Sequence, residues 1–405
     1  MQHAAGLLSR PFRASSVIRS LSHACTRGFT VLALESSADD TCAAVVTSDR
    51  KVLSNVVINQ QAFLEEYGGI HPFVALHAHQ RNMPGAVQRA LQEANLTVND
   101  VDGIAFTRGP GIPGCLSVCG NAARTLAAAL NKPLVGVHHM QAHALTPLLT
   151  SPPSEQPEFP FLTLLVSGGH TLLLLASSVT SFRILATTLD ESIGNAYDKV
   201  ARLLRIPLDN TSAGAALERY CASDPSSAEK EIPEIRLPRP MPGRLAFSYS
   251  ALHSTVERFL DARRGALDEA TRLGLARSFQ RAAVGQLEDK LLLGMRKCAR
   301  EGVRVRSLVV SGGVASNSYL RERLRACLDK ESPDERISLV FPPPSLCTDN
   351  AVMIAWASMY RFLAGDTDDY AIETRPRWSL EELEGPSMVV GSAESDDVDK
   401  DESTL

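Results

Sequence analysis

One pattern of apolar runs and polar turns occurs twice in this sequence, and this repeat limits the possible folds more than any other feature. The first copy has an apolar run, a polar turn and two further apolar runs, at residues 31–34, 35–40, 41–46 and 52–58. The second copy repeats that order at residues 161–166, 167–170, 171–175 and 182–187. Short continuous apolar runs are typical of strands buried on both faces. The repeat therefore predicts an α/β fold of two similar lobes with a ligand cleft between them.

Helices and a linker are expected around these strands. Helical patterns follow each set of apolar runs, at residues 75–94, at residues 116–130 and within residues 255–298. Residues 151–160 (SPPSEQPEFP) are rich in proline and poor in apolar side chains, which is typical of a linker. We therefore expect an N-terminal lobe over residues 31–150 and a C-terminal lobe over residues 161–386.

The two ends of the chain differ in composition from the lobes. Residues 1–30 are rich in serine, carry no acidic residue and contain four arginines, Arg10, Arg13, Arg19 and Arg27. This composition is typical of a mitochondrial presequence, and it predicts a location in the mitochondrial matrix; a disordered N-terminal tail is the alternative. Residues 387–405 are polar and acidic, and we expect them to be disordered.

Charge and hydropathy limit the possible partners. The formal net charge of the 405 residues is −5, and removal of the four presequence arginines takes it to −9. An acidic protein of this kind binds nucleic acid through a local basic patch. Candidates expected around the mouth of the cleft are Arg202, Arg205, Arg236, Arg239, Arg244, Arg296, Lys297, Arg300, Arg304 and Arg306. No apolar stretch is long enough to span a membrane, so no membrane insertion is expected.

Two histidines are spaced for a metal ion. His139 and His143 lie four residues apart, so on a helix both imidazoles project from one face and can bind the same ion. Two ordinary buried or surface histidines are the alternative. A zincin-type peptidase would need a glutamate directly after the first histidine as its general base. Met140 stands there, so the sequence argues against a peptidase.

A third ligand is available in residues 347–350 (CTDN). Asp349 or Asn350 can simply cap the helix that is expected to begin at Ala351. Alternatively, the Asp349 carboxylate faces the cleft and joins His139 and His143 in a set of two imidazoles and one carboxylate. Such a set leaves coordination positions open and suits one iron or zinc ion per subunit with Lewis-acid chemistry.

Two glycine turns are suited to an anionic ligand. Residues 167–170 (SGGH) follow one apolar run, and residues 311–317 (SGGVASN) join a predicted strand to a predicted helix. Backbone amides at such turns and at helix N-termini bind phosphate groups. With the turns expected on opposite lobes, they predict a nucleotide in the cleft. The sequence lacks the P-loop and GxGxxG patterns. Asp198 can accept hydrogen bonds from a ribose or can be an ordinary solvated charge.

Several ordered motifs resemble those of the threonylcarbamoyl-transferase family that modifies tRNA, in its mitochondrial branch. The resemblance extends from about Val31 to Tyr360. The motifs read ESSADDT (35–41), YGGIHP (67–72), GPGIPG (109–114), HMQAH (139–143), VSGGHT (166–171), AYDKVAR (196–202), SGGVASN (311–317) and CTDN (347–350). Some positions depart from the family pattern. Ala38 and Asp40 replace Cys and Glu, and His138 stands where the family often has Asn.

The resemblance implies a duplicated actin-like, sugar-kinase-like ATPase fold. It implies transfer of the threonylcarbamoyl group from threonylcarbamoyl-AMP to N6 of adenosine 37, with release of AMP. The tRNAs implied are mitochondrial ones that read codons starting with A, and a homodimer is expected. The implied metal ligands are His139, His143 and Asp349. The implied substrate-binding residues are Leu165, Val166, Ser167, Gly168, Gly169, Asp198, Gly214, Glu218, Ser311, Gly312, Gly313 and Asn317. The match at Gly214 and Glu218 is looser, since residues 210–214 (NTSAG) replace YPGG.

Two other classes of function compete with the tRNA-modifying transferase. A small-molecule kinase or ATPase can share the fold, because a fold does not determine a function. Such an enzyme would hold Mg²⁺ through carboxylates and phosphates, so the two histidines argue against it. A scaffolding protein with an inactive nucleotide site is the third class, and the complete set of motifs argues against that loss.

Overall fold

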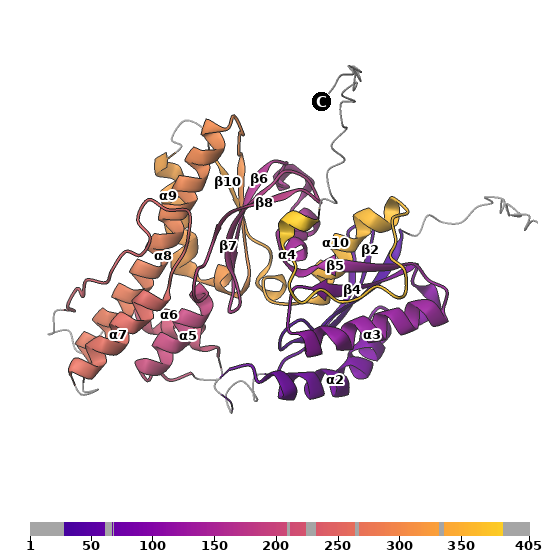
Figure 1. Ribbon diagram of the computed structural model, residues 1–405, viewed down its shortest axis with the longest axis horizontal. Coiled ribbons are helices and arrows are strands. Elements are labelled where there is room, and N and C mark those ends of the chain that lie inside the picture. Colours follow the sequence, from indigo (N-terminus) through magenta and orange to yellow (C-terminus); the bar gives the residue numbers. More distant parts are fainter. Residues whose placement is uncertain are drawn as a thin grey trace, which may run out of the picture.

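The computed structural model describes residues 28–60, 67, 69–208, 211–223, 232–263, 267–331 and 336–383. Residues 1–27 of the predicted presequence and the predicted acidic tail therefore lie outside the described residues. Within the described part, two five-stranded sheets stand side by side, with helices around and between them (Figure 1).

The first sheet has the strand order β3-β2-β1-β4-β5. β1 pairs antiparallel with β2, and β2 with β3, whereas β1–β4 and β4–β5 are parallel. The strands are β1 (Thr30–Glu35), β2 (Thr41–Thr47), β3 (Val52–Ile58), β4 (Gly103–Gly109) and β5 (Leu134–His138). Every residue of β1, β2 and β5 is buried, because helices cover both faces of the sheet.

The second sheet repeats this topology, in the order β8-β7-β6-β9-β10. β6, β7 and β8 form an antiparallel meander, and β9 and β10 continue in parallel from β6. The strands are β6 (Phe161–Val166), β7 (Thr171–Ala176), β8 (Phe182–Thr187), β9 (Ser307–Ser311) and β10 (Ser338–Val340). The duplicated α/β fold implied by the resemblance to actin-like and sugar-kinase-like ATPases is thereby confirmed.

The predicted helices are present, and residues at their starts explain where they begin. α2 and α3 begin with prolines, which suit the first helical position because their missing N–H is not needed there. α8 begins after Asp268, whose side chain accepts the Thr271 N–H. The helices beside these sheets are α2 (Pro72–Glu93), α3 (Pro113–Ala129), α5 (Ile193–Leu203), α6 (Ala213–Ala222), α7 (Ser250–Ala262), α8 (Glu269–Arg300) and α9 (Ser318–Glu331). Among the described helices, none has the length and apolar character needed to cross a membrane.

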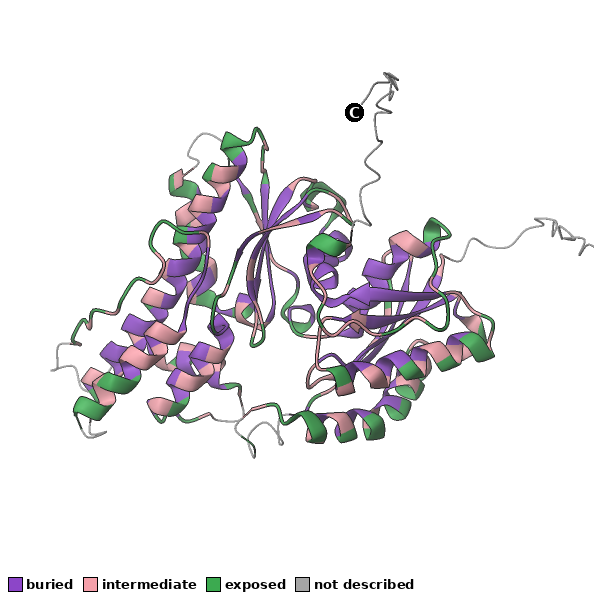
Figure 2. Ribbon diagram, in the orientation of Figure 1, coloured by how far each residue is buried: buried purple, intermediate pink, exposed green. Residues whose placement is uncertain are grey.

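Two helices cross between the sheets. α4 (His139–Thr150) follows β5 of the first sheet but contacts β6 and β9 of the second. α10 (Ala351–Leu363) follows β10 of the second sheet but packs across β1, β2, β4 and β5 of the first. Both helices are buried along almost their whole length (Figure 2). α10 is apolar on nearly all sides, as expected for a buried helix. α4 and α10 also contact each other, so the start of each helix lies at the junction of the sheets.

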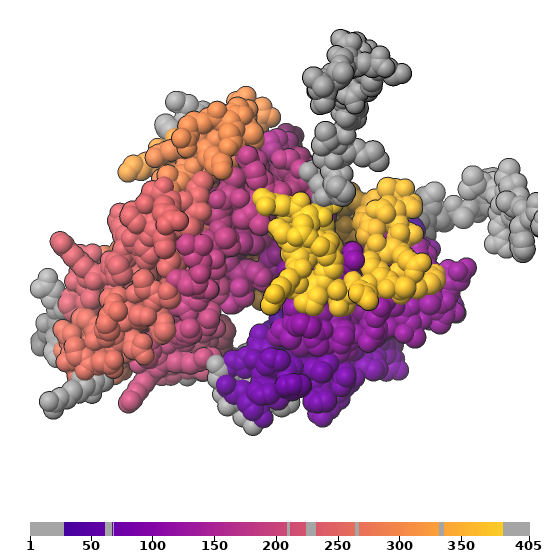
Figure 3. All heavy atoms as spheres, viewed as in Figure 1, coloured from indigo at the N-terminus to yellow at the C-terminus, as the bar shows by residue number. Residues whose placement is uncertain are grey.

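After α10 the chain returns over the N-terminal lobe. We call residues 366–378 the C-terminal strap. Asp368 pairs with Leu134 of β5, which is the edge strand of the first sheet. Figure 3 shows the C-terminal part of the described chain (yellow) lying over the N-terminal lobe (purple). The strap thereby covers a strand edge that would otherwise present unpaired backbone groups.

Candidate active site

His139 and His143 come together at the start of α4. β5 ends at His138, whose Nδ1 accepts the Met140 N–H at 3.1 Å and so caps the helix. The helix therefore begins at His139, and His143 follows one turn later on the same face. Both imidazoles are buried, and their ring centroids lie 4.8 Å apart with the rings nearly perpendicular.

Asp349 completes the predicted set of three side chains. Asn350 caps α10, since its Oδ1 accepts the Met353 N–H at 2.9 Å, and Asp349 is left to face α4. Its Oδ1 lies 3.3 Å from His139 Nε2 and 3.1 Å from His143 Nε2. One ligand atom from each of the three residues lies within 4.8 Å of the others. Of the alternatives left open by the sequence, capping therefore falls to Asn350.

Glu35 joins this group, and sequence reasoning missed its role. Its Oε2 lies 3.2 Å from His139 Nδ1 at the end of β1. The Ser37 N–H donates to Oε1 at 2.5 Å, and the Thr107 hydroxyl donates to Oε2. A carboxylate on Nδ1 keeps the proton there and leaves Nε2 free to bind a metal ion. The one signal in the sequence was the position of Glu35 at the carboxyl end of a predicted strand.

The carboxylates at this site favour the binding of a cation. Burial raises the pKa of Asp349, but the positive charge of His139 outweighs this and holds it well below its usual value. Burial lowers the pKa of His139, but Asp349 and Glu35 outweigh it and raise that pKa to about 10. The pKa of His143 is lowered, chiefly by burial. The carboxylates of Asp349 and Glu35 are thus ionised, and His143 is neutral. His139 carries one additional proton, and a divalent cation can replace that proton.

The acidic turn after β1 lies close enough to the site to interact with its charges. Burial and the neighbouring carboxylates Asp39, Asp349 and Glu35 raise the pKa of Asp40 to about 8. Asp40 Oδ1 also accepts a hydrogen bond from Asn59 Nδ2 at 3.2 Å. From the second sheet, burial lowers the pKa of His170 to about 4, with His139 as the next cause. The turns after β1 and β6 therefore both act electrostatically on the same centre.

The two glycine turns lie on the same sheet, so their expected placement on opposite lobes was wrong. β6 and β9 are neighbouring parallel strands, and their carboxyl ends meet at one edge. Gly312 has φ = +99°, and a Cβ there would lie 2.3 Å from the Val166 carbonyl oxygen. Only glycine permits this backbone and this approach. A Cβ on Gly313 would lie 3.8 Å from Thr348 Cγ2, so the turn adjoins the residue before Asp349.

The hairpin after β6 is open at its tip. Ser167 Oγ accepts the backbone N–H groups of Gly169 and His170, at 3.3 and 3.0 Å. A Cβ on Gly168 or Gly169 would meet no described atom within 4 Å. On the inner side the first turn of α5 packs closely, since a Cβ on Gly194 would lie 2.6 Å from the Ser167 oxygen. The tip therefore offers accessible backbone beside a helix N-terminus.

The remaining predicted substrate residues meet in pairs in the C-terminal lobe. Asp198 of α5 accepts the Gly214 N–H at 3.0 Å, and burial raises its pKa. Glu218 of α6 accepts the Ser318 N–H at 2.6 Å, and Asn317 Oδ1 accepts the Leu320 N–H at 2.9 Å. Both side chains therefore bind the start of α9. Leu165 and Val166 are buried in β6, and Ser311 is buried at the end of β9.

Part of the predicted basic patch lies away from the glycine turns. Arg304 and Arg306 precede β9, whereas the glycine turn follows it, so they lie at the opposite end of the strand. Arg296 of α8 is paired in a bidentate manner with Glu331. A basic hollow of about 610 Å³, missed by sequence reasoning, lies between α9 and β10 instead. Its lining residues are Glu155, Arg321, Arg325, Arg336, Ser338, Leu339 and Phe341.

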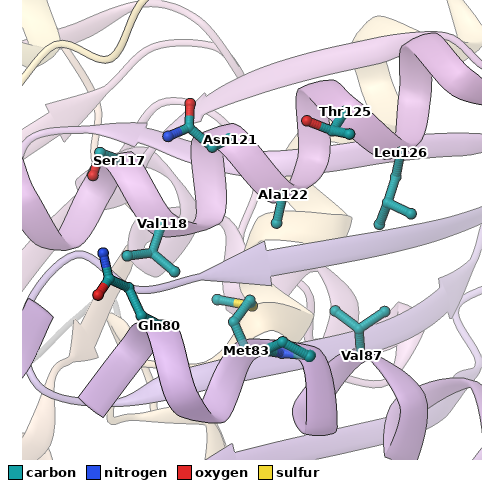
Figure 4. A pocket seen from close by; sticks show the side chains of 10 residues that line it. Gln80, Met83, Val87, Ser117, Val118, Asn121, Ala122, Thr125 and Leu126 are labelled. Carbon is teal, nitrogen blue, oxygen red and sulfur yellow. The ribbon is translucent and has the colours of Figure 1, made fainter. Parts of the chain in front are cut away.

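A second hollow lies on the N-terminal lobe, away from these groups. It occupies about 530 Å³ between α2 and α3 (Figure 4). Apolar side chains such as Met83, Val87, Val118 and Leu126 dominate its lining. The lining has no ionisable side chain, so this groove is suited to an apolar surface rather than to chemistry.

Comparison with known proteins decides the family. The model of the tRNA N6-adenosine threonylcarbamoyltransferase family matches residues 51–356. The chain belongs to this family. It is 42% identical to the tRNA N6-adenosine threonylcarbamoyltransferase of Sphingopyxis alaskensis, over 87% of this chain and 95% of that protein. It is 38% identical to the probable mitochondrial tRNA N6-adenosine threonylcarbamoyltransferase of Arabidopsis thaliana, over 87% of this chain and 75% of that protein.

Among solved structures, the chain is similar to component A of (R)-2-hydroxyglutaryl-CoA dehydratase from Acidaminococcus fermentans, with a TM-score of 0.49 and 12% identity. The alignment covers 82% of this chain and 99% of that chain. The fold assignment itself rests on the matched topology of the two sheets. Family membership decides against the small-molecule kinase, the peptidase and the inactive scaffold.

Proposed function

We propose that this transferase moves the threonylcarbamoyl group from threonylcarbamoyl-AMP to N6 of adenosine 37 and releases AMP. One observation carries this proposal: the set of His139, His143 and Asp349 adjoins the glycine turn of residues 311–313 through Thr348. A centre that polarises a carbonyl group and a turn suited to a phosphate therefore lie side by side. An adenylate with an activated acyl group presents these two features on neighbouring atoms.

We propose that His139, His143 and Asp349 hold one divalent metal ion per subunit, iron or zinc. Two imidazoles and one carboxylate suit these ions. When bound, such an ion would supply Lewis-acid polarisation of the threonylcarbamoyl carbonyl. Glu35 orients His139 and keeps its proton on Nδ1. The side chain of Asp349 is 23% exposed while the imidazoles are 4–5% exposed, so the set opens toward ligand on the carboxylate side.

The C-terminal lobe is proposed to bind the adenylate. Leu165–Gly169 and Ser311–Gly313 bring backbone amides of two parallel strands to the phosphate, where they would stabilise the charge of departing AMP. Asp198 and Gly214 are already in contact, and we propose that they face the ribose. Glu218 and Asn317 are both fixed at the start of α9, and we propose that these two side chains face the nucleoside. No side-chain nucleophile is needed, because the mixed anhydride is already activated.

The tRNA is proposed to bind partly at the basic hollow between α9 and β10. Three of its seven lining residues are arginines, and it carries one acid, Glu155. Arg321 donates to the Ala315 carbonyl at 2.7 Å, which links the hollow to the glycine turn. Phosphate contacts of this kind make affinity fall with added salt. Arg336→Ala is therefore expected to weaken tRNA binding and to reduce its dependence on salt; an unchanged salt dependence would contradict this contact.

We propose that the protein modifies mitochondrial tRNAs that read codons starting with A, and that it does so in the mitochondrial matrix. We also propose that it is a homodimer, in which each chain has lobes at residues 31–150 and 161–386. The basic, acid-free first 30 residues and the mitochondrial relative support the location. The apolar groove between α2 and α3 offers a surface for a second copy. Import into isolated mitochondria tests the location, and light scattering of the purified protein tests the dimer.

The reaction itself is tested with purified protein, threonylcarbamoyl-AMP and unmodified mitochondrial tRNA, followed by mass analysis of the nucleosides. We expect N6-threonylcarbamoyladenosine and an equal amount of AMP. Transcripts with adenosine 37 replaced by guanosine should give no product. Release of AMP without modified tRNA would contradict the proposed acceptor. Product formation only in the presence of ATP and free threonine would contradict the proposed donor.

A further inference from the structure

The C-terminal strap reaches the start of α4 through Trp378. The indole ring of Trp378 lies 4.7 Å from the imidazole of His138, measured between ring centroids. His138 Nε2 lies 3.1 Å from the Trp378 main-chain oxygen. His138 is the residue directly before His139, and it is 1% exposed. The strap is therefore in contact with the residue that sets where the metal-binding helix begins.

The two contacts of His138 define its protonation. Its Nδ1 accepts the Met140 N–H, so Nδ1 carries a lone pair. The proton is then on Nε2, which donates to the Trp378 carbonyl. One neutral imidazole thus links the first turn of α4 to the strap. Loss of either contact leaves a buried polar atom without its partner.

Trp378 is itself in contact with two arginines. The guanidinium groups of Arg108 and Arg375 lie 5.3 and 4.9 Å from its ring centroid. The backbone of the strap is tied to the same place, since the Arg375 N–H donates to the Arg108 carbonyl at 2.7 Å. A Cβ on Gly109 would lie 1.8 Å from the Arg375 oxygen, so the strap and the end of β4 touch backbone to backbone. The indole therefore has one well-defined position.

The other end of the strap is fixed to α10 and β5. Arg361 near the end of α10 binds both Asp366 and Asp368, with Arg361 Nη1 2.9 Å from Asp368 Oδ2. Asp368 also accepts the Gly136 N–H of β5 at 2.7 Å. One end of the strap is thus fixed to α10, the helix that follows Asp349. The other end contacts His138, the residue before His139. The strap closes a loop between the two elements that carry the three candidate metal ligands.

We propose that the C-terminal strap is a brace for the metal centre and that His138 and Trp378 are positioning residues, which hold α4 in register with α10. This inference rests on the proposed metal site. The brace acts because the ligands come from elements about 200 residues apart in the chain, His143 and Asp349 being separated by 206 positions. Outer contacts that orient metal ligands typically contribute about 10- to 100-fold to metal affinity.

The first test compares His138→Leu with His138→Asn. Asparagine can accept the Met140 N–H and donate to the Trp378 carbonyl, whereas leucine can do neither. In apo protein loaded with Co²⁺, we expect His138→Leu to bind at least about tenfold more weakly than wild type. Its ligand-field spectrum should change as well. His138→Asn should remain within about threefold of wild type. Equal losses in both variants would overturn the brace.

The second test uses Trp378→Ala, with Trp378→Phe to restore an aromatic ring beside the two arginines. Trp378→Ala should weaken Co²⁺ binding by about tenfold, and Trp378→Phe should recover most of that loss. Tyr370→Phe removes a hydrogen bond to the Lys132 carbonyl elsewhere in the strap and should leave the Co²⁺ affinity unchanged. Wild-type affinity in Trp378→Ala would overturn the proposal.

Amide exchange separates failure of the brace from failure of the metal site. In metal-free protein, the amides of Met140 to His143 should exchange at least about tenfold faster in His138→Leu and Trp378→Ala than in wild type. Unchanged exchange would overturn the brace, whether or not metal binds. If wild-type protein binds no Co²⁺ while exchange accelerates as expected, the proposed metal site fails and the brace of α4 stands.

Discussion

The two sheets share one topology, but the turns at their equivalent positions differ in chemistry. In the N-terminal lobe, the turn between β1 and β2 follows directly on Glu35, the last residue of β1, which is fully buried and hydrogen-bonded to His139. In the C-terminal lobe, the turn between β6 and β7 is Ser-Gly-Gly-His, with open space beside Gly168 and Gly169. Under the proposed function, one copy of the fold would support a cation through side chains, and the other would present its backbone to an anion. The two copies therefore share one arrangement of strands and differ in the chemistry of their turns.

The segments that follow the third strand differ as well. Between β3 and β4 the described residues contain one α-helix, α2, whereas between β8 and β9 they contain α5, α6, α7 and α8. Asp198, Gly214 and Glu218 all lie on these additional helices. Three of the candidate nucleoside contacts therefore lie in a segment that has more helices than the corresponding segment of the other lobe, within the described residues.

The largest effect is expected from removing a ligand of the N-terminal lobe. His143→Ala should abolish stoichiometric metal binding and reduce tRNA modification to background, because the site keeps two of three ligands. Metal analysis by mass spectrometry and the nucleoside assay measure the two outcomes. His77→Ala, an exposed histidine on α2, is the matched control and should behave as wild type. Full metal content together with activity in His143→Ala would end the proposed role.

Gly312→Ala should cause the largest loss of stability in the C-terminal lobe. Its Cβ would lie 2.3 Å from the Val166 oxygen at a φ of +99°, so we expect a loss of about 3 kcal/mol in the free energy of unfolding. Gly168→Ala, with open space at its Cβ, should change it by less than about 0.5 kcal/mol. Urea denaturation measures both. Similar values for the two variants would show that the β6 and β9 ends do not pack closely.

Glu35→Gln tests the buried carboxylate of the first turn. A glutamine amide can donate to His139 Nδ1 and would then place the imidazole proton on Nε2, which faces Asp349. We expect metal affinity to fall by about 10- to 100-fold. Thr107→Val removes the hydroxyl that donates to Glu35 but keeps the contact with His139, so its effect should be smaller. Isothermal titration with Zn²⁺ measures both, and a larger effect of Thr107→Val would contradict the assigned order.

Asp190→Asn tests what anchors the additional helices to the second sheet. Asp190 accepts hydrogen bonds from the hydroxyls of Ser248 and Ser250 and from the backbone of Glu191 and Tyr249. Burial raises its pKa, but these bonds outweigh it and hold the pKa below 3.8. The unfolded chain therefore binds this proton more readily. The stability that Asp190 contributes is fully present at pH values above the pKa of Asp190 in the unfolded chain. It is lost as the pH falls through the pKa of Asp190 in the folded protein.

We expect Asp190→Asn to lower stability at pH 7 by about 1 to 3 kcal/mol, because asparagine has one acceptor oxygen where aspartate has two, so either the two hydroxyls or the two backbone N–H groups lose their acceptor. The difference from wild type should shrink as the pH falls below 4. Urea denaturation at pH 7 and pH 3 measures it. A difference that grows toward low pH would contradict the sign of the pKa shift, and no difference at pH 7 would contradict the anchoring role.

Much of the fold and of the site was predictable from local sequence. The strands 52–58 and 182–187 were predicted at the bounds that the structure has. The spacing of His139 and His143 was sufficient to place both on one helical face. Glu35 was not predictable as a partner of His139, because no spacing connects residues that are 104 positions apart. Likewise, Asn350 and Asp349 were equivalent capping candidates until the course of the chain separated them.

The sequence by itself determined the duplicated strand pattern, the two glycine turns and the pair of histidines, because each depends on side chains a few residues apart. Tertiary structure alone decided what these groups face. It brought both glycine turns to one edge of the second sheet. It also packed α4 against the second sheet and α10 against the first, and it placed the C-terminal strap in contact with His138. Periodicity and turn chemistry are local, whereas a metal centre needs ligands from distant elements, and only packing of those elements sets their distances.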